Sequence, residues 1–139
     1  MSADVTTLVD TNVLLDLVTD HPDWSKWSVA RLEEAALAGP LVINDIVYAE
    51  TSIRYERMED LDAMLDQAMI EVSATPRAAL FLAGKAFQQY RVVGGTRTGI
   101  LPDFFIGAHA SIEGWRLLTR DVGRYQRYFP RVTLITPSA

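Results

Sequence analysis

The sequence predicts an α/β protein in which a parallel sheet of five strands is covered by helices on both faces. The main observation is that short, β-rich apolar runs alternate along the chain with longer segments whose apolar residues follow a helical spacing. The second is that no internal repeat, low-complexity segment or linker interrupts this alternation. We therefore expect a single domain over residues 1–139.

The expected elements follow from the positions of apolar runs and breakers. Strands are expected at 6–9, 41–43, 70–72, 115–118 and 132–135. Helices are expected at 12–18, 27–38, 44–54, 58–69, 75–92 and 102–112, with a short helical turn around Tyr125.

Polar and proline residues mark the expected helix starts. Asp23 or Ser25 is expected to cap the second helix. Thr75 is expected to cap the fifth helix, with Pro76 in its first turn. Pro102 opens the sixth helix, after a loop at 94–101 that glycines border.

Composition narrows the classes of function. Hydrophobic residues make up 49% of the 139 residues and charged residues 22%, which is typical of a globular protein. There is no cysteine, which excludes disulfides and thiolate metal sites and fits a cytoplasmic location. We expect neither a signal peptide nor a membrane span. The net charge of −5 argues against strong non-specific binding of nucleic acid, although it can hide a local basic rim.

Four acidic residues fall at positions where chemistry is expected. Asp10 directly follows the first strand, and Asp121 follows the fourth strand after two residues. Asp103 lies in the first turn of a helix, and Glu50 lies in the helix that follows the second strand. In open α/β sheets, ligands bind outside the carboxyl ends of the strands, so Asp10 and Asp121 meet at that edge if their strands are neighbours.

A cluster of carboxylates is costly unless a cation compensates it. Mg²⁺ and Mn²⁺ prefer oxygen ligands, and such an ion can polarise a phosphoryl oxygen and lower the pKa of a bound water. Each acid also has a simpler interpretation: Asp10 and Asp121 as helix caps, Asp103 as a partner of a helix dipole, and Glu50 as a solvated helix residue. We assign the other acids, Asp16 among them, to solvated faces.

The neighbours of these acids carry a family resemblance. Residues 9–16 (VDTNVLLD), 48–50 (YAE), 101–110 (LPDFFIGAHA) and 118–121 (LTRD), the last followed by Tyr125 and by Tyr128-Phe129, closely resemble the four motifs of PIN domains. The first motif is most similar to that of VapC-like toxins of toxin–antitoxin modules. Order and separations match, and the resemblance covers nearly the whole chain.

The resemblance implies a three-layer α/β/α sandwich with strand order 3-2-1-4-5. It also implies a Mg²⁺- or Mn²⁺-dependent endoribonuclease directed at tRNA or rRNA, with a cognate antitoxin and frequent homodimerisation. Asp10, Asp103 and Asp121 would hold the metal, and Glu50 would be a further ligand or would orient the attacking water.

Other side chains are candidates for supporting roles. Thr11, Asn12 and Thr119 could orient the carboxylates or metal waters, or could only cap helices and turns. Arg91, Arg97 and Arg120, with Lys85 behind them, are candidates for contacts with RNA phosphates, and a solvated surface position is the alternative for each.

Aromatic and histidine side chains are weaker candidates. Trp24, Trp27 and Trp115 could stack on bases, but core packing is the preferred interpretation for Trp27 and Trp115. His21 and His109 could act as a general base, but packing is preferred, because His109 does not share a helix face with Asp103.

Two other functions remain open at this point. A haloacid-dehalogenase-type phosphatase also begins with an aspartate after the first strand, but it needs a second aspartate two residues later, where this chain has Asn12. A non-catalytic binding module that kept the fold is the other alternative, and the intact set of four acids argues against it.

Overall fold

The computed structural model describes residues 4–137 and has the predicted α/β architecture. Its strands are β1 (Thr7–Val9), β2 (Leu41–Asn44), β3 (Ile70–Ser73), β4 (Arg116–Leu118) and β5 (Leu134–Ile135). Its helices are α1 (Thr11–Thr19), α2 (Ser25–Ala38), α3 (Asp45–Ser52), α4 (Met58–Gln67), α5 (Arg77–Val92), α6 (Pro102–Glu113) and α7 (Gly123–Tyr128).

The strands form one parallel sheet in the order β3-β2-β1-β4-β5, which confirms the expected order. In this order β1 lies between β2 and β4, with Val9 opposite Leu118. From β1 the chain adds β2 and β3 on one side of the sheet and then adds β4 and β5 on the other side. The carboxyl ends of β1 and β4 therefore lie side by side. This is the position at which open α/β sheets bind ligands.

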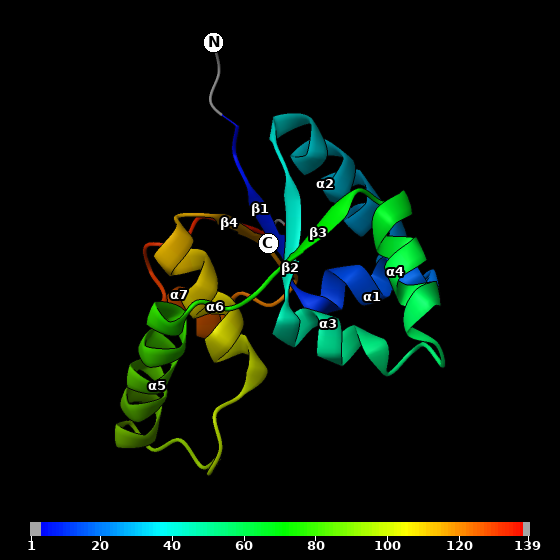
Figure 1. Cartoon of the computed structure of the whole chain (residues 1–139). Coiled ribbons are helices and arrows are strands. Elements are labelled where there is room, and N and C mark those ends of the chain that lie inside the picture. The colour runs from blue at the N-terminus through cyan, green and yellow to red at the C-terminus, as the bar shows by residue number, and fades with distance from the viewer. Residues whose placement is uncertain (1–3, 138–139) are drawn as a thin grey trace.

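Helices cover both faces of the sheet. Figure 1 shows α1, α2 and α4 on one side of the strands and α5, α6 and α7 on the other. The short helix α3 lies at the edge between the two groups and contacts both α1 and α6. This arrangement brings α1, α3, α6 and the β4–α7 loop together around the carboxyl end of β1.

The central strands form the core. Leu8, Val9, Ile43, Leu117 and Leu118 are 0% exposed. Strands that are buried on both faces read as continuous apolar runs rather than as alternating ones. The apolar character of these runs is therefore a consequence of the helical layers on both sides.

Local sequence signals set two of the helices that surround the site. The Asn44 Oδ1 atom accepts a hydrogen bond from the Val47 amide at 2.9 Å, which starts α3. Pro102 occupies the first turn of α6, as predicted, and the helix ends at Gly114, whose φ of 71° is in the left-handed region.

Two capping predictions are wrong. Trp24 is the N-cap of α2, without a side-chain cap bond, and Ser25 is the first helical residue. Pro76, rather than Thr75, is the N-cap of α5. The amide and hydroxyl of Thr75 instead donate to the carboxylate of Asp45, because the chain passes close to the start of α3 after β3.

In residues 4–137, no helix has both the length and the apolar character that a membrane crossing requires.

Alanine at the two glycines inside long helices should have opposite effects on stability. A Cβ on Gly107 would lie 2.4 Å from the ring of Phe129, which is buried, whereas a Cβ on Gly84 would meet nothing within 4 Å. We expect Gly107→Ala to lower the free energy of unfolding by about 1–3 kcal/mol through overpacking. Gly84→Ala should raise it by about 0.5–1 kcal/mol through helix propensity. Urea unfolding of both variants measures this, and stabilisation by both would contradict the close contact of α6 with Phe129.

Candidate functional site

The carboxylate of Asp10 is buried at the carboxyl end of β1 and is held by donors from three segments. Its Oδ1 atom accepts from the Thr11 amide at 2.7 Å. Its Oδ2 atom accepts from the Thr119 hydroxyl at 2.8 Å and from the Tyr125 hydroxyl at 2.9 Å. Asp10 is also the N-cap of α1, which confirms the simpler interpretation of this residue as a helix cap.

Burial dominates the electrostatics of Asp10. Desolvation raises the pKa of its carboxyl from 3.8 to about 6, although the hydrogen bonds from Thr119, Tyr125 and Thr11 oppose this shift. The nearby charge of Glu50 makes a smaller contribution to the same increase. Burial also raises the pKa of Tyr125 well above 10, so its hydroxyl stays a neutral donor to Asp10 at physiological pH.

Thr11 joins Asp10 to Glu50. The Thr11 hydroxyl donates to the Glu50 Oε1 atom at 2.6 Å, while its amide donates to Asp10. Glu50 lies on α3 and is half-buried. Asp10 directly follows β1, and Glu50 lies in the helix that follows the neighbouring strand β2, so one residue joins the segments after two neighbouring strands.

Asn12 and Thr119 connect the first and fourth motifs. The Asn12 Nδ2 atom lies 3.3 Å from the Thr119 Oγ1 atom and 3.4 Å from the Asp10 Oδ2 atom. The Asn12 Oδ1 atom accepts from the Arg120 amide at 3.2 Å. Thr119 is 0% exposed, and its Oγ1 atom accepts from the Asp121 amide at 3.0 Å. These bonds join the start of α1 to the turn that carries Asp121.

Asp103 has one satisfied and one unsatisfied carboxylate oxygen. Its Oδ2 atom accepts from the Arg124 Nη1 atom at 2.8 Å. Its Oδ1 atom is buried and has no hydrogen-bond partner in the protein. A buried carboxylate oxygen without a partner is costly, so this atom is suited to a cation or a water that comes from solvent.

The four predicted acids line one pocket of about 340 Å³, together with Thr11, Asn12, Arg97, Arg124 and Tyr125. We call this the acid pocket. Within residues 4–137, no three carboxylates or imidazoles converge closely enough to form a finished metal site. The donor set nevertheless fits Mg²⁺ or Mn²⁺, because it consists of carboxylate oxygens and includes the unpartnered Oδ1 atom of Asp103.

Asp16 and Arg120 depart from the sequence-based expectations. Asp16 is 1% exposed rather than solvated. Its two carboxylate oxygens accept from the Arg120 guanidinium at 2.7 and 3.0 Å, and the Ser28 hydroxyl adds a bond at 2.7 Å. Arg120 also lies 4.9 Å over the ring of Trp24. Its guanidinium is therefore paired with a buried carboxylate, and Arg120 does not line the acid pocket.

The other predicted basic residues are spread over a larger surface. Arg97 lines the acid pocket, and Arg91 donates to its carbonyl oxygen at 2.5 Å. Lys85 lies outside the acid pocket, with its ammonium 5.1 Å over the ring of Phe81. Sequence reasoning missed Arg124, although its position three residues after Asp121 in a helical turn was a usable signal.

The packing interpretations of His109, Trp27 and Trp115 are confirmed. His109 is 1% exposed, its ring lies 4.9 Å from that of Trp115, and burial lowers its pKa. Trp27 and Trp115 pack against the core. His21 accepts from the Asp23 amide through Nδ1 at 3.1 Å and does not line the acid pocket.

The raised pKa of Asp10 predicts a pH dependence of stability in the metal-free protein. This pKa is about 6 in the folded state and near 3.8 in the unfolded state. As the pH falls, the folded state therefore binds the proton at a higher pH than the unfolded state does. The wild type should therefore gain roughly 1 kcal/mol of stability relative to Asp10→Asn between pH 7.5 and pH 5. Urea unfolding of both proteins in EDTA measures the difference. A difference that is constant with pH would show that Asp10 is not desolvated.

Comparisons with known proteins agree with this geometry. Among solved structures, a VapBC2 complex from Rickettsia felis bound to a promoter DNA fragment matches with a TM-score of 0.74 and 22% identity, over 96% of this chain and 100% of that chain. VapBC-1 from nontypeable Haemophilus influenzae matches with a TM-score of 0.71 and 20% identity, over 95% and 98%. A toxin–antitoxin complex from Klebsiella pneumoniae matches with a TM-score of 0.68 and 21% identity, over 95% and 98%. At these identities the likeness shows a shared fold.

No curated protein matches the sequence significantly. The family model described as PIN domain matches residues 7–129, which contain all four acids of the acid pocket and every strand except β5. The match confirms the resemblance seen in the four motifs. The chain therefore belongs to the PIN domain family, a family of nucleases.

Proposed function

We propose that this chain is an endoribonuclease that depends on Mg²⁺ or Mn²⁺ and acts as the toxin of a toxin–antitoxin pair, with tRNA or rRNA as its substrate. The observation that carries the proposal is the gathering of Asp10, Glu50, Asp103 and Asp121 in one pocket at the carboxyl edge of the sheet. Membership of the PIN domain family and the fold shared with chains of VapBC complexes support it.

Asp10, Asp103 and Asp121 would hold the metal directly or through water, and Glu50 would be a further ligand or would orient the attacking water. A divalent cation in such a site supplies charge stabilisation at the phosphoryl oxygens and activates water. It would also offset the cost of ionising Asp10, whose raised pKa reflects burial without sufficient positive charge.

The chain's own residues would position the reacting groups. Thr119 and Tyr125 hold one oxygen of Asp10, so the carboxylate would keep one orientation toward a bound metal. Glu50 is fixed by the Thr11 hydroxyl and offers its second oxygen to a water. Arg97 and Arg124 line the same pocket and would contact the phosphate of the scissile nucleotide or its neighbour.

Further parts of the proposal concern the partners and the setting. We propose one PIN domain over residues 1–139, a cognate antitoxin, a homodimer and a cytoplasmic location. Solved relatives of the same fold are described as VapBC and toxin–antitoxin complexes, which supports an antitoxin partner. Expression of the chain alone should arrest growth, and expression together with the neighbouring gene should relieve the arrest if that gene encodes the antitoxin.

Removal of one acid tests the catalytic proposal. Purified wild type should cut total RNA at discrete positions with Mg²⁺ or Mn²⁺ and should lose this activity in EDTA. Asp10→Ala should lower the rate by at least about 100-fold, because the metal loses a buried ligand. Asp66→Ala removes an exposed acid on α4 and should cut like the wild type.

Circular dichroism of each variant controls for folding, and sequencing of the fragment ends identifies the cleavage sites. Cutting by folded Asp10→Ala at the wild-type rate would refute the role of Asp10. Hydrolysis of a small phosphate ester without RNA cleavage would favour a phosphatase, and no activity under any metal condition would favour a binding module.

The Thr119 hydroxyl gives a second, finer prediction. Thr119→Val keeps the shape of this buried side chain but removes the donor to Asp10 and the acceptor of the Asp121 amide, and it should lower the single-turnover rate constant by about 10-fold to 100-fold. Thr119→Ser keeps the hydroxyl and should retain most of the activity. Single-turnover cleavage with saturating Mn²⁺ measures both. Equal rates in the two variants would show that the hydroxyl does not orient Asp10.

A further inference from the structure

The acid pocket continues into a second pocket along α7. This second pocket, of about 420 Å³, is lined by Tyr90, Gly123, Arg127 and Tyr128 together with Asp121 and Arg124, and the last two also line the acid pocket. Two shared side chains make the pockets neighbours on one continuous surface. A chain-like ligand that occupies the acid pocket therefore has a hollow into which it can extend.

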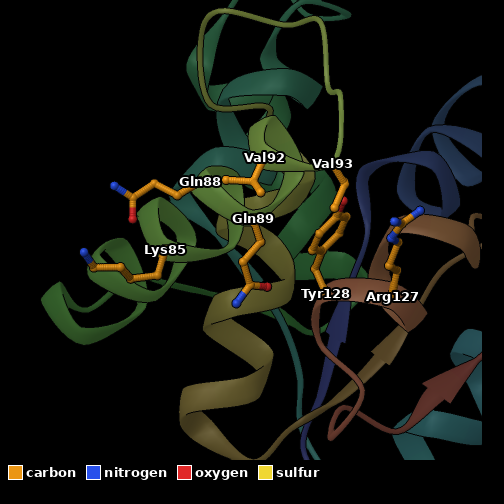
Figure 2. Close-up of a pocket in the computed structure, with 7 residues that line it drawn as sticks. All are labelled: Lys85, Gln88, Gln89, Val92, Val93, Arg127 and Tyr128. Carbon is orange, nitrogen blue, oxygen red and sulfur yellow. The ribbon is translucent and has the colours of Figure 1, made fainter.

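A third pocket, of about 540 Å³, shares Arg127 and Tyr128 with the second one. It lies between α7 and the last turns of α5 (Figure 2). Figure 2 shows Tyr128 and Arg127 next to the Val93 end of α5, with Lys85 extending away from them toward the outside. We call the second and third pockets together the α5–α7 groove.

The charge of the α5–α7 groove is opposite to that of the whole chain. The chain has a net charge of −5, yet the groove is lined by Arg127 and Lys85, and by Arg124, whose charge is partly compensated by its pair with Asp103. Its one acid, Asp121, stands at the end that it shares with the acid pocket. A polyanion is therefore repelled by most of this protein and attracted along this path.

The groove also offers aromatic surface beside its cations. The Arg127 guanidinium lies 5.6 Å from the ring centre of Tyr128, and the Arg124 guanidinium lies 5.4 Å from that of Tyr90. The two tyrosine rings pack edge to face at 6.4 Å, which fixes their positions. Val92 and Val93 add exposed apolar surface at the outer end. Cations interleaved with aromatic rings are the combination that binds single-stranded nucleic acid.

We propose that the α5–α7 groove is a binding subsite for the single-stranded RNA on one side of the scissile phosphate. Arg127 contacts a backbone phosphate, and Tyr128 provides a face for a base. This inference rests on the proposed function, because the RNA strand must start in the acid pocket. A second copy of the chain is a poorer occupant, because a surface with an excess of cations would have to pack against a copy of itself.

The test measures binding of a fluorescently labelled 12-nucleotide oligouridylate by anisotropy in EDTA, over a series of salt concentrations. Arg127 is exposed and lies outside the acid pocket, so Arg127→Ala should fold normally. We expect it to weaken binding about fivefold to tenfold and to lower the slope of log K against log salt by roughly 0.7, the value for one phosphate contact on a single strand. Arg127→Lys should restore most of the slope.

Arg77→Ala is the matched control, because Arg77 is exposed at the opposite end of α5. It removes the same charge and should leave the salt slope unchanged. An equal loss of RNA affinity in Arg127→Ala and Arg77→Ala, or no RNA binding by the wild type, would overturn the subsite. So would a change of oligomeric state in Arg127→Ala, measured by sedimentation, with RNA affinity unaltered.

Cleavage of total RNA, measured separately, distinguishes the two proposals. RNA binding that depends on Arg127 but not on Arg77, in a protein that cuts no RNA, would support the subsite and refute the nuclease. Metal-dependent cutting with identical binding by the two alanine variants would support the nuclease and refute the subsite.

Discussion

The burial of one carboxylate at the end of the central strand is the constraint on which the rest of the site depends. Asp10 is 6% exposed, and its charge is costly there unless donors and a cation surround it. The donors come from the start of α1, from the end of β4 and from α7, through Thr11, Thr119 and Tyr125. These segments meet only because β1 and β4 are neighbours in the sheet, so the strand order is itself a requirement of the site.

The protein's own side chains compensate the negative charges of the site acids to different degrees. Arg124 pairs with one oxygen of Asp103, while the other oxygen has no partner and Asp10 keeps a raised pKa. A site that were fully neutralised by its own side chains would have little affinity for a divalent cation. The remaining unfavourable charge lowers the stability of the metal-free protein, and a bound cation of the kind we propose would relieve it. On the other side of the same turn, the Asp16–Arg120 pair and Trp24 hold the segment that carries Asp121.

Much of this architecture could be predicted from sequence, because the relevant signals are local. Apolar runs give the strands, Pro102 and Asn44 give helix starts, and the motifs around the four acids gave the strand order through resemblance. Two of the misses are pairings between residues far apart in the chain. Nothing near Asp16 in sequence reveals its partner Arg120, which is 104 residues away. The partner of Thr75 is Asp45, which lies 30 residues earlier, so the local sequence favours a helix cap instead.

The most direct test of the central claim is anomalous diffraction from crystals of the protein soaked in Mn²⁺. If the four carboxylates form a site for a divalent cation, a peak should appear in the acid pocket within coordination distance of Asp10 and of the Oδ1 atom of Asp103, and it should vanish in Asp103→Asn. Crystals that show no peak in this pocket at saturating Mn²⁺, with the Arg124–Asp103 pair intact, would contradict the claim.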